Sequence, residues 1–69
     1  MKSTINRVAG YRIMLNMNQK DMAGYLGITS QSYSNKERGM RKFSDEEKLK
    51  LKELFRKIDS DLTIDAIFF

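Results

Sequence analysis

Small polar side chains fill one short stretch of this sequence. It holds two amides, Gln31 and Asn35, among the hydroxyl groups of Ser30, Ser32 and Ser34. Amide side chains can bond the edges of base pairs, and small neighbours allow a helix to enter a DNA groove about 12 Å wide. The residue types therefore indicate a surface that reads nucleic acid.

A group of cations follows this stretch directly. Four of them fall within seven residues: Lys36, Arg38, Arg41 and Lys42. The first 42 residues carry eight Lys and Arg against two Asp and Glu, a net charge of +6, whereas residues 43–69 carry five against seven, a net −2. A polyanion would be attracted to the first two-thirds of the chain and repelled by the last third. The alternative interpretation is a solvated basic surface without a partner.

The composition argues against catalysis and metal binding. The chain has no cysteine and no histidine, so it lacks a thiol nucleophile, an imidazole base and the ligands of the common zinc sites. Its neighbouring serines have no histidine or obvious lysine partner that could activate them. The acidic run Asp45, Glu46 and Glu47 is explained by the first turn of a capped helix. We expect a protein that is not an enzyme and holds no metal or cofactor.

The length of the chain predicts a single domain over residues 1–69. Without cysteines to cross-link it, such a small core should be compact and rich in helix. No apolar run approaches the roughly 20 residues of a membrane span. Lys2 is not followed by the apolar region of a signal peptide. We expect an intracellular domain with no membrane contact.

Capping signals divide the chain into five predicted helices, and no stretch alternates with a period of two. The predicted N-caps are Ser3 or Thr4, Asn18, Thr29, Ser44 and Thr63. The predicted ends are about Met17, Gly27, about Arg38 before Gly39, and, for the fourth helix, the turn with Arg56 and Lys57. The sequence therefore predicts an all-α fold.

The apolar faces of these helices follow the spacing i, i+3, i+4 and i+7. The expected core residues are Ile5, Val8, Ala9 and Leu15; Met22, Ala23 and Leu26; Leu51, Leu54, Phe55 and Ile58; and Ile64, Ile67 and Phe68. Gly24 costs roughly 1 kcal/mol relative to alanine inside a helix, so it indicates a close helix crossing. Arg12 lies on the apolar face of the first helix and needs a partner if it is partly buried.

The connection between the second and third helices predicts a helix-turn-helix. The three residues Gly27-Ile28-Thr29 are too few for the helices to lie antiparallel, so the helices should meet at a large angle. Ala23 supplies a small side chain where they cross, and Gly27 can adopt a positive φ in the turn. Tyr33 should face the core, which leaves the polar face of the third helix pointing outward.

Residues in register with a known family support this interpretation. They are Asn18-Gln19, Met22-Ala23, Leu26-Gly27-Ile28-Thr29, Tyr33-Ser34 and Glu37-Arg38-Gly39. Over roughly residues 5–43 the chain resembles the lambda-repressor/Cro (XRE-like) helix-turn-helix domains. Its closing residues 62–68 resemble the short last helix of such domains in phages of Gram-positive bacteria. The resemblance implies a compact five-helix bundle that binds a double-stranded DNA operator as a phage repressor or Cro protein, in the cytoplasm of a bacterial host.

The resemblance also implies roles for individual residues. Gln19 would bond a phosphate from the start of the second helix. The reading surface, on the helix at about residues 30–38, would consist of Thr29, Ser30, Gln31, Ser32 and Asn35. Within it, Gln31 and Asn35 are best suited to adenine edges. The sugar–phosphate backbone would be held by Arg38, Arg41 and Lys42. Glu37 matches the family position that pairs with an arginine, so an Arg12–Glu37 ion pair should tie the first helix to the third.

Lys36 departs from the family pattern, which usually has an apolar residue facing the core at this position. Either its stem lies over the edge of the core with the ammonium group in water, or the third helix is rotated or frayed there. With its charge in solvent, Lys36 would belong to the binding surface.

Two alternatives concern the partner. Small helix-turn-helix proteins of temperate phages include antirepressors, or modulators of repression, which bind a repressor protein and block its DNA-binding surface. The same polar and basic face would serve that function. Separately, Ile67, Phe68 and Phe69 are the candidate patch for a homodimer, and their alternative role is to close this small core.

Overall fold

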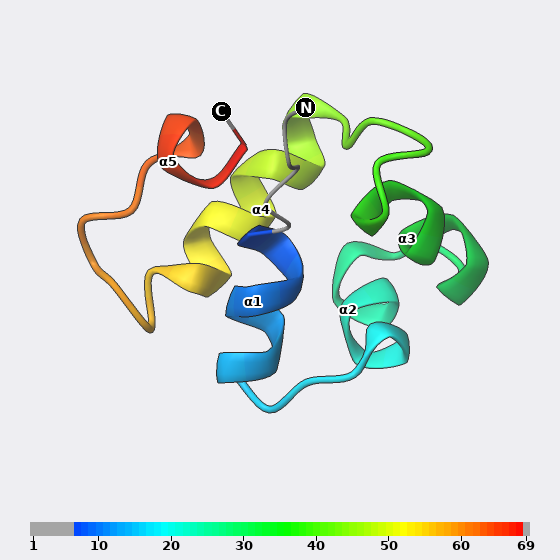
Figure 1. Ribbon diagram of the computed structural model, residues 1–69, viewed down its shortest axis with the longest axis horizontal. Coiled ribbons are helices and arrows are strands. Elements are labelled where there is room, and N and C mark those ends of the chain that lie inside the picture. The colour runs from blue at the N-terminus through cyan, green and yellow to red at the C-terminus, as the bar shows by residue number, and fades with distance from the viewer. Residues whose placement is uncertain (1–6, 69) are drawn as a thin grey trace, which may run out of the picture.

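Five helices joined by short loops make up residues 7–68, the part of the chain that the computed structural model describes. They are α1 (Arg7–Met14), α2 (Gln19–Leu26), α3 (Ser30–Glu37), α4 (Asp45–Phe55) and α5 (Ile64–Phe68) (Figure 1). Residues 7–68 contain no strand, which confirms the predicted all-α fold of five helices. The predicted N-cap at Ser3 or Thr4, the predicted core residue Ile5 and Phe69 of the candidate dimer patch lie outside the described residues.

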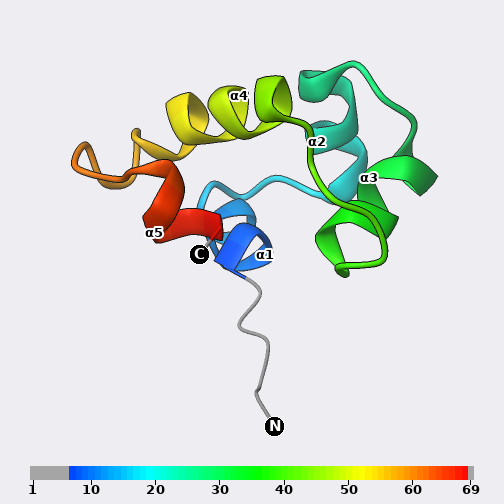
Figure 2. The ribbon, with the colours of Figure 1, turned by 90° about the horizontal axis from the view of Figure 1, so that it is seen from above.

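The helices α3 and α5 lie on opposite sides of the molecule. In the views of Figures 1 and 2, α1 and α4 lie between them. α2 packs against α3, and both α1 and α4 contact α5. The C-terminal helix therefore covers the side of the core that is remote from α3.

The first three helices end in the same Schellman motif, with one residue in the left-handed conformation. That residue is Asn16 after α1, Gly27 after α2 and Gly39 after α3, with φ values of 62°, 76° and 87°. Each motif is closed by an N–H group bonded to the carbonyl five residues earlier: Met17 to Arg12, Ile28 to Ala23 and Met40 to Asn35. The predicted ends at Gly27 and Gly39 are confirmed.

The prediction that the first helix continues to about Met17 is wrong. Asn16 takes a positive φ and ends the helix at Met14. Asparagine tolerates this conformation better than other residues that carry a side chain. Arg12 then donates a hydrogen bond from Nη1 to the Met17 carbonyl at 2.9 Å, which fixes the path of the chain into α2.

The predicted helix starts are confirmed wherever they lie in the described chain. Asn18 and Ser44 each form a complete capping box, with Asp21 and Glu47 respectively. Thr29 and Thr63 accept hydrogen bonds from the N–H groups of residues 32 and 66. These local bonds set where α2, α3, α4 and α5 begin.

The fourth helix ends at Phe55 and does not include Arg56 and Lys57, contrary to the prediction. The N–H groups of Lys57 and Ile58 bond to carbonyls only three residues back, which tightens the chain after the helix. Ile58 is rotated off the apolar stripe by this turn and is 36% exposed, so it is not a core residue as predicted.

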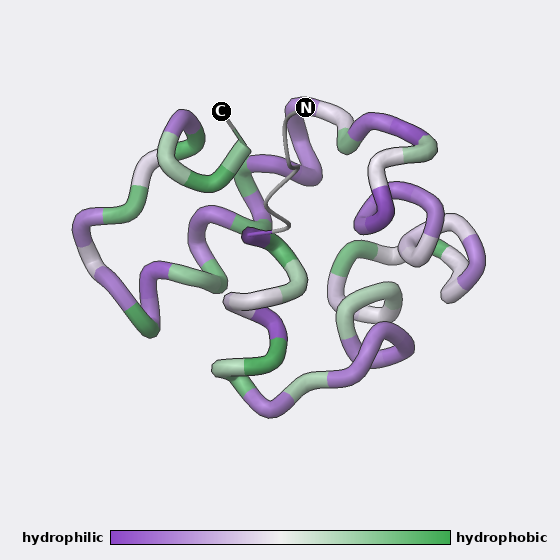
Figure 3. The backbone as a smooth tube through the Cα atoms, in the orientation of Figure 1, coloured by the Kyte–Doolittle hydropathy of each residue, from purple (hydrophilic) through white to green (hydrophobic). Residues whose placement is uncertain are grey.

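Eleven buried hydrophobic residues form one core: Val8, Met22, Ala23, Leu26, Tyr33, Phe43, Leu51, Leu54, Phe55, Leu62 and Ile67. Tyr33 and Phe68 both pack their rings against Phe43, with centroid distances of 6.1 and 5.7 Å. Green hydrophobic stretches recur along α1, α4 and α5 in Figure 3, whereas α3 is mostly white and purple. The third helix thus contributes little besides Tyr33 to the core.

Two residues of the predicted dimer patch, Ile67 and Phe68, lie in the described part of the chain, and neither is fully exposed. Ile67 is 4% exposed, within the core of its own chain. Phe68 is half-buried against Phe43 and Lys48. Ile67 lies in the core and Phe68 packs against it because α5 folds back onto α1 and α4, while a homodimer through the C-terminal residues stays a prediction.

The expectation that Gly24 marks a close helix crossing is wrong. A Cβ atom built at Gly24 meets no atom within 4 Å, and the residue is exposed. No packing contact therefore requires a glycine at this position in α2.

Gly24→Ala is accordingly expected to raise the free energy of unfolding by about 1 kcal/mol, the helix-propensity difference between the two residues. Urea denaturation followed by circular dichroism at 222 nm measures this change. Gly27→Ala is the matched control, since a Cβ there also meets nothing but φ is +76°. That variant should lose stability. A destabilised Gly24→Ala protein would contradict the prediction.

Candidate nucleic-acid interface

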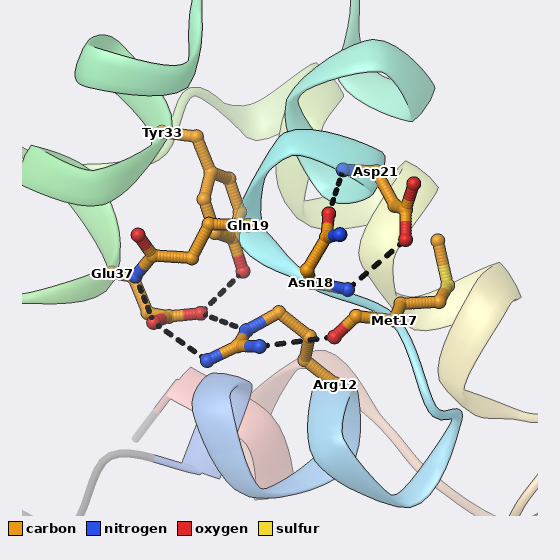
Figure 4. A network of polar contacts seen from close by, with 7 residues as sticks. All are labelled: Arg12, Met17, Asn18, Gln19, Asp21, Tyr33 and Glu37. Carbon is orange, nitrogen blue, oxygen red and sulfur yellow. Dashed lines mark hydrogen bonds and ion pairs between the residues drawn. The ribbon is translucent and has the colours of Figure 1, made fainter.

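A network of polar side chains around Glu37 holds α3 in place (Figure 4). The Glu37 carboxylate accepts hydrogen bonds from Arg12 Nε at 2.8 Å, from the Tyr33 hydroxyl at 2.6 Å and from Gln19 Nε2 at 2.8 Å. The Glu37 side chain is 4% exposed and that of Arg12 is 15% exposed. The predicted Arg12–Glu37 ion pair is therefore present. Because its members come from α1, α2 and α3, the network fixes the position of α3 on the core.

The network keeps Glu37 ionised. Burial by itself raises the pKa of this carboxyl, but the hydrogen bonds from Arg12, Tyr33 and Gln19 outweigh it and hold the pKa below its ordinary value. Burial, together with the hydrogen bond to Glu37, raises the pKa of the Tyr33 hydroxyl. The phenol therefore stays protonated and can donate to the carboxylate.

Gln19 has a structural role that the sequence reasoning missed. Its half-buried side chain uses one N–H group of Nε2 to bond Glu37. Its contact with a phosphate stays a prediction, which the second N–H group of the same nitrogen could make. The signal for this role is the position of Gln19 in the first turn of α2. It directly follows the turn after α1, where Arg12 bonds the Met17 carbonyl.

Lys36 is not a free cation, because its ammonium group is paired with a carboxylate, and its place in the binding surface stays a prediction. Its Nζ lies 2.8 Å from both carboxylate oxygens of Glu47. The two side chains are 15% and 12% exposed. Neither expected alternative is correct, because the ammonium group is paired with a carboxylate and α3 stays helical at this residue. Sequence reasoning found Glu47 only as the capping residue of α4, whereas it also ties α4 to α3.

The two buried carboxylates predict a loss of stability in acid. Burial raises the pKa of Glu47, but hydrogen bonds from Lys36 and the Ser44 backbone lower it below the ordinary value, as for Glu37. Both groups bind protons more tightly in the unfolded chain, so their stabilisation is complete above the unfolded pKa of about 4.3 and decreases as pH falls through their folded values.

The free energy of unfolding of Glu47→Gln should therefore lie below that of the wild type at pH 7 and approach it as the pH falls below about 4. Urea denaturation between pH 3 and pH 7 gives the two curves. Glu53→Gln changes an exposed carboxylate on the same helix and serves as the control. A constant difference between Glu47→Gln and the wild type across this range would contradict the prediction.

The outward side of α3 carries a row of three polar side chains, which we call the α3 ridge: Gln31, Asn35 and Arg38. Gln31 and Arg38 are exposed and Asn35 is partly exposed, whereas Tyr33 and Glu37 point inward. Gln31 Nε2 donates to Asn35 Oδ1 at 3.1 Å, and Arg38 Nη2 donates to the same oxygen at 3.3 Å. The ridge is thus a connected row of hydrogen-bonding groups along one helix face.

The structure brings most of the predicted reading residues together. One surface hollow beside the α3 ridge is lined by Thr29, Gln31, Ser32, Asn35, Lys36 and Arg41. Ser30 is exposed at the start of α3 but does not line this hollow. Thr29 also has a structural role as the N-cap of α3.

The loop after α3 presents the remaining cations. Arg41 and Lys42 are exposed, and neither forms an ion pair with another residue in the described part of the chain. The N–H groups of Met40 and Arg41 both bond to the Asn35 carbonyl, at 2.8 and 3.3 Å, which holds the loop against the end of α3. Arg41 and Lys42 are thus exposed cations in the loop that directly follows α3, and their contacts with a DNA backbone, like those of Arg38, stay a prediction.

No family model, curated protein or solved structure matches this chain. Within residues 7–68, no helix is long and apolar enough to cross a membrane, and no three carboxylates are grouped as metal ligands.

Proposed function

We propose that the protein is a sequence-specific DNA-binding transcription regulator that places α3 in the major groove. The observation that carries this proposal is the α3 ridge, a polar helix face with two amides that points away from the core. The ridge includes the exposed cation Arg38, and the loop directly after α3 carries the exposed cations Arg41 and Lys42. Cations of this kind bind phosphates and set the register on the duplex, whereas amides on a helix face bond base edges.

The distribution of charge supports the same orientation. The first 42 residues carry a net +6, and the acidic remainder includes α4, whose first turn holds Asp45, Glu46 and Glu47. A duplex that approaches the α3 ridge would meet the positive part of the chain. The pair α2 and α3 would act as a helix-turn-helix, in line with the resemblance to the lambda-repressor/Cro domains. We infer a phage regulator that acts on an operator in the cytoplasm of a bacterial host.

The dependence of affinity on salt tests this proposal. Two copies on adjacent half-sites, contacting about six phosphates together, should give a slope of log affinity against log salt near −5. The measurement is fluorescence anisotropy with a labelled duplex from the control region next to the gene, at NaCl concentrations from 50 to 200 mM. Lys42→Ala should make the slope less negative by about 1 for each phosphate contact it removes. A slope near zero would contradict binding through phosphates.

The structure also favours a second candidate, an antirepressor that binds a repressor protein. Met40 is 67% exposed between Gly39 and Arg41, within the cationic loop. An apolar side chain adds little to phosphate binding, whereas methionine is enriched in protein interfaces. Under this alternative, the neighbouring repressor should bind the protein in a one-to-one complex with a shallow salt dependence. The same titration in the presence of that repressor separates the two functions.

A further inference from the structure

The hydrogen bonds along the α3 ridge restrict what each side chain can offer to a base. An asparagine oxygen has two lone pairs, and Oδ1 of Asn35 accepts from both Gln31 Nε2 and Arg38 Nη2. The Asn35 amide therefore has its acceptor occupied and only the two N–H groups of Nδ2 left for a ligand. In the described structure these N–H groups make no other hydrogen bond.

The neighbours of Asn35 keep different groups. Gln31 retains its oxygen as an acceptor together with one N–H group, while Arg38 retains four of its five N–H donors. Along α3 the ridge thus offers a donor and an acceptor at Gln31, then donors alone at Asn35 and Arg38. The ridge is exposed at both ends, so a duplex could meet this pattern without any change in the fold.

The bases differ in the hydrogen-bond donors and acceptors that they present to these side chains in the major groove. Adenine offers an acceptor, N7, beside a donor, the N6 amino group, whereas guanine offers two acceptors, N7 and O6. The usual two-bond contact between asparagine and adenine needs the side-chain oxygen, which in Asn35 is already used. Donors alone fit guanine, and the free donor and acceptor of Gln31 fit adenine.

We propose that the α3 ridge selects guanine at the base pair facing Asn35 and adenine at the base pair facing Gln31. This inference rests on the proposed function, since it specifies which DNA the proposed regulator prefers. It also revises the expectation from residue types alone, by which both amides suit adenine. Gln31 and Arg38 act on the base facing Asn35 as positioning residues, because their hydrogen bonds occupy the Asn35 oxygen.

Selection from randomised duplexes, followed by affinity measurements on single-base variants of the selected site, tests this inference. The base pair facing Asn35 is the one whose preference disappears in Asn35→Ala. There the wild type should bind guanine about tenfold more tightly than adenine, within the range of one good base contact. In Gln31→Ala/Arg38→Ala the oxygen of Asn35 loses both of its donors and can accept a hydrogen bond from a base. The ratio of guanine to adenine affinity should therefore fall at least about fivefold, or adenine should become the preferred base.

A control variant and two kinds of contrary result complete this experiment. Lys42→Ala removes an exposed cation that donates no hydrogen bond to the Asn35 oxygen, so it should weaken all duplexes alike and leave the preference unchanged. Two results would overturn the inference and leave the proposed function standing. One is that the wild type prefers adenine at the base pair facing Asn35. The other is that Gln31→Ala/Arg38→Ala keeps the guanine preference unchanged. If the selection enriches no sequence at all, the proposed function itself fails and the inference fails with it.

Discussion

Glu37→Ala is expected to lower the free energy of unfolding by about 3–5 kcal/mol, the usual cost of removing one partner of a buried ion pair. The substitution leaves the Arg12 guanidinium, whose side chain is 15% exposed, without a carboxylate. It also removes the acceptor of the Tyr33 hydroxyl, which is fully buried. Small domains are stable by only about 5–15 kcal/mol, so a large part of the stability should be lost. Urea denaturation at pH 7 measures the change.

Two further variants serve as controls for the effect of Glu37→Ala. Glu46→Ala, which removes an exposed carboxylate from α4, should change stability by less than about 0.5 kcal/mol. The double variant Arg12→Ala/Glu37→Ala should lose less than the sum of the two single variants, since neither charge is then left unpaired. A loss below about 1 kcal/mol in Glu37→Ala would mean that the network does not hold α3 on the core.

Gln31→Ala/Asn35→Ala should abolish the preference for the operator over unrelated DNA. Each amide contact with a base is worth about 1–3 kcal/mol of discrimination, so the ratio of specific to non-specific affinity should fall roughly 30-fold or more. The salt slope should change little, because Arg38, Arg41 and Lys42 are kept. Anisotropy titrations against operator and scrambled duplexes give the ratio.

The fold should tolerate this double substitution, since Gln31 is exposed, Asn35 is partly exposed and neither side chain belongs to the core. An unchanged thermal transition would confirm it. Lys42→Ala is the matched control, because loss of a phosphate contact should weaken both duplexes equally and preserve the ratio. If the preference survives Gln31→Ala/Asn35→Ala, then α3 is not the reading helix.

Most starts and ends of the helices could be predicted from the sequence, because they depend on hydrogen bonds between residues close together in the chain. A cap such as Asn18 or Ser44 bonds an N–H group three residues away, and Gly27 and Gly39 adopt the positive φ that ends a helix. Asn16 does the same after α1, and it was missed because glycine is the stronger signal for this conformation. The Arg12–Glu37 pair could be predicted because a charge on an apolar face requires a partner and the resemblance to the lambda-repressor/Cro domains implied Glu37 as that partner.

The partners of half-buried groups were decided by the tertiary structure. Lys36 meets Glu47 only because α3 and the start of α4 come together in the fold. Likewise, Ile67 lies in the core and Phe68 packs against it only because α5 folds back onto α1 and α4. The sequence by itself determined an all-helical chain with a polar, basic segment on one helix. Which of those polar groups stay free for a ligand depends on packing, because burial and pairing join residues that are distant along the chain.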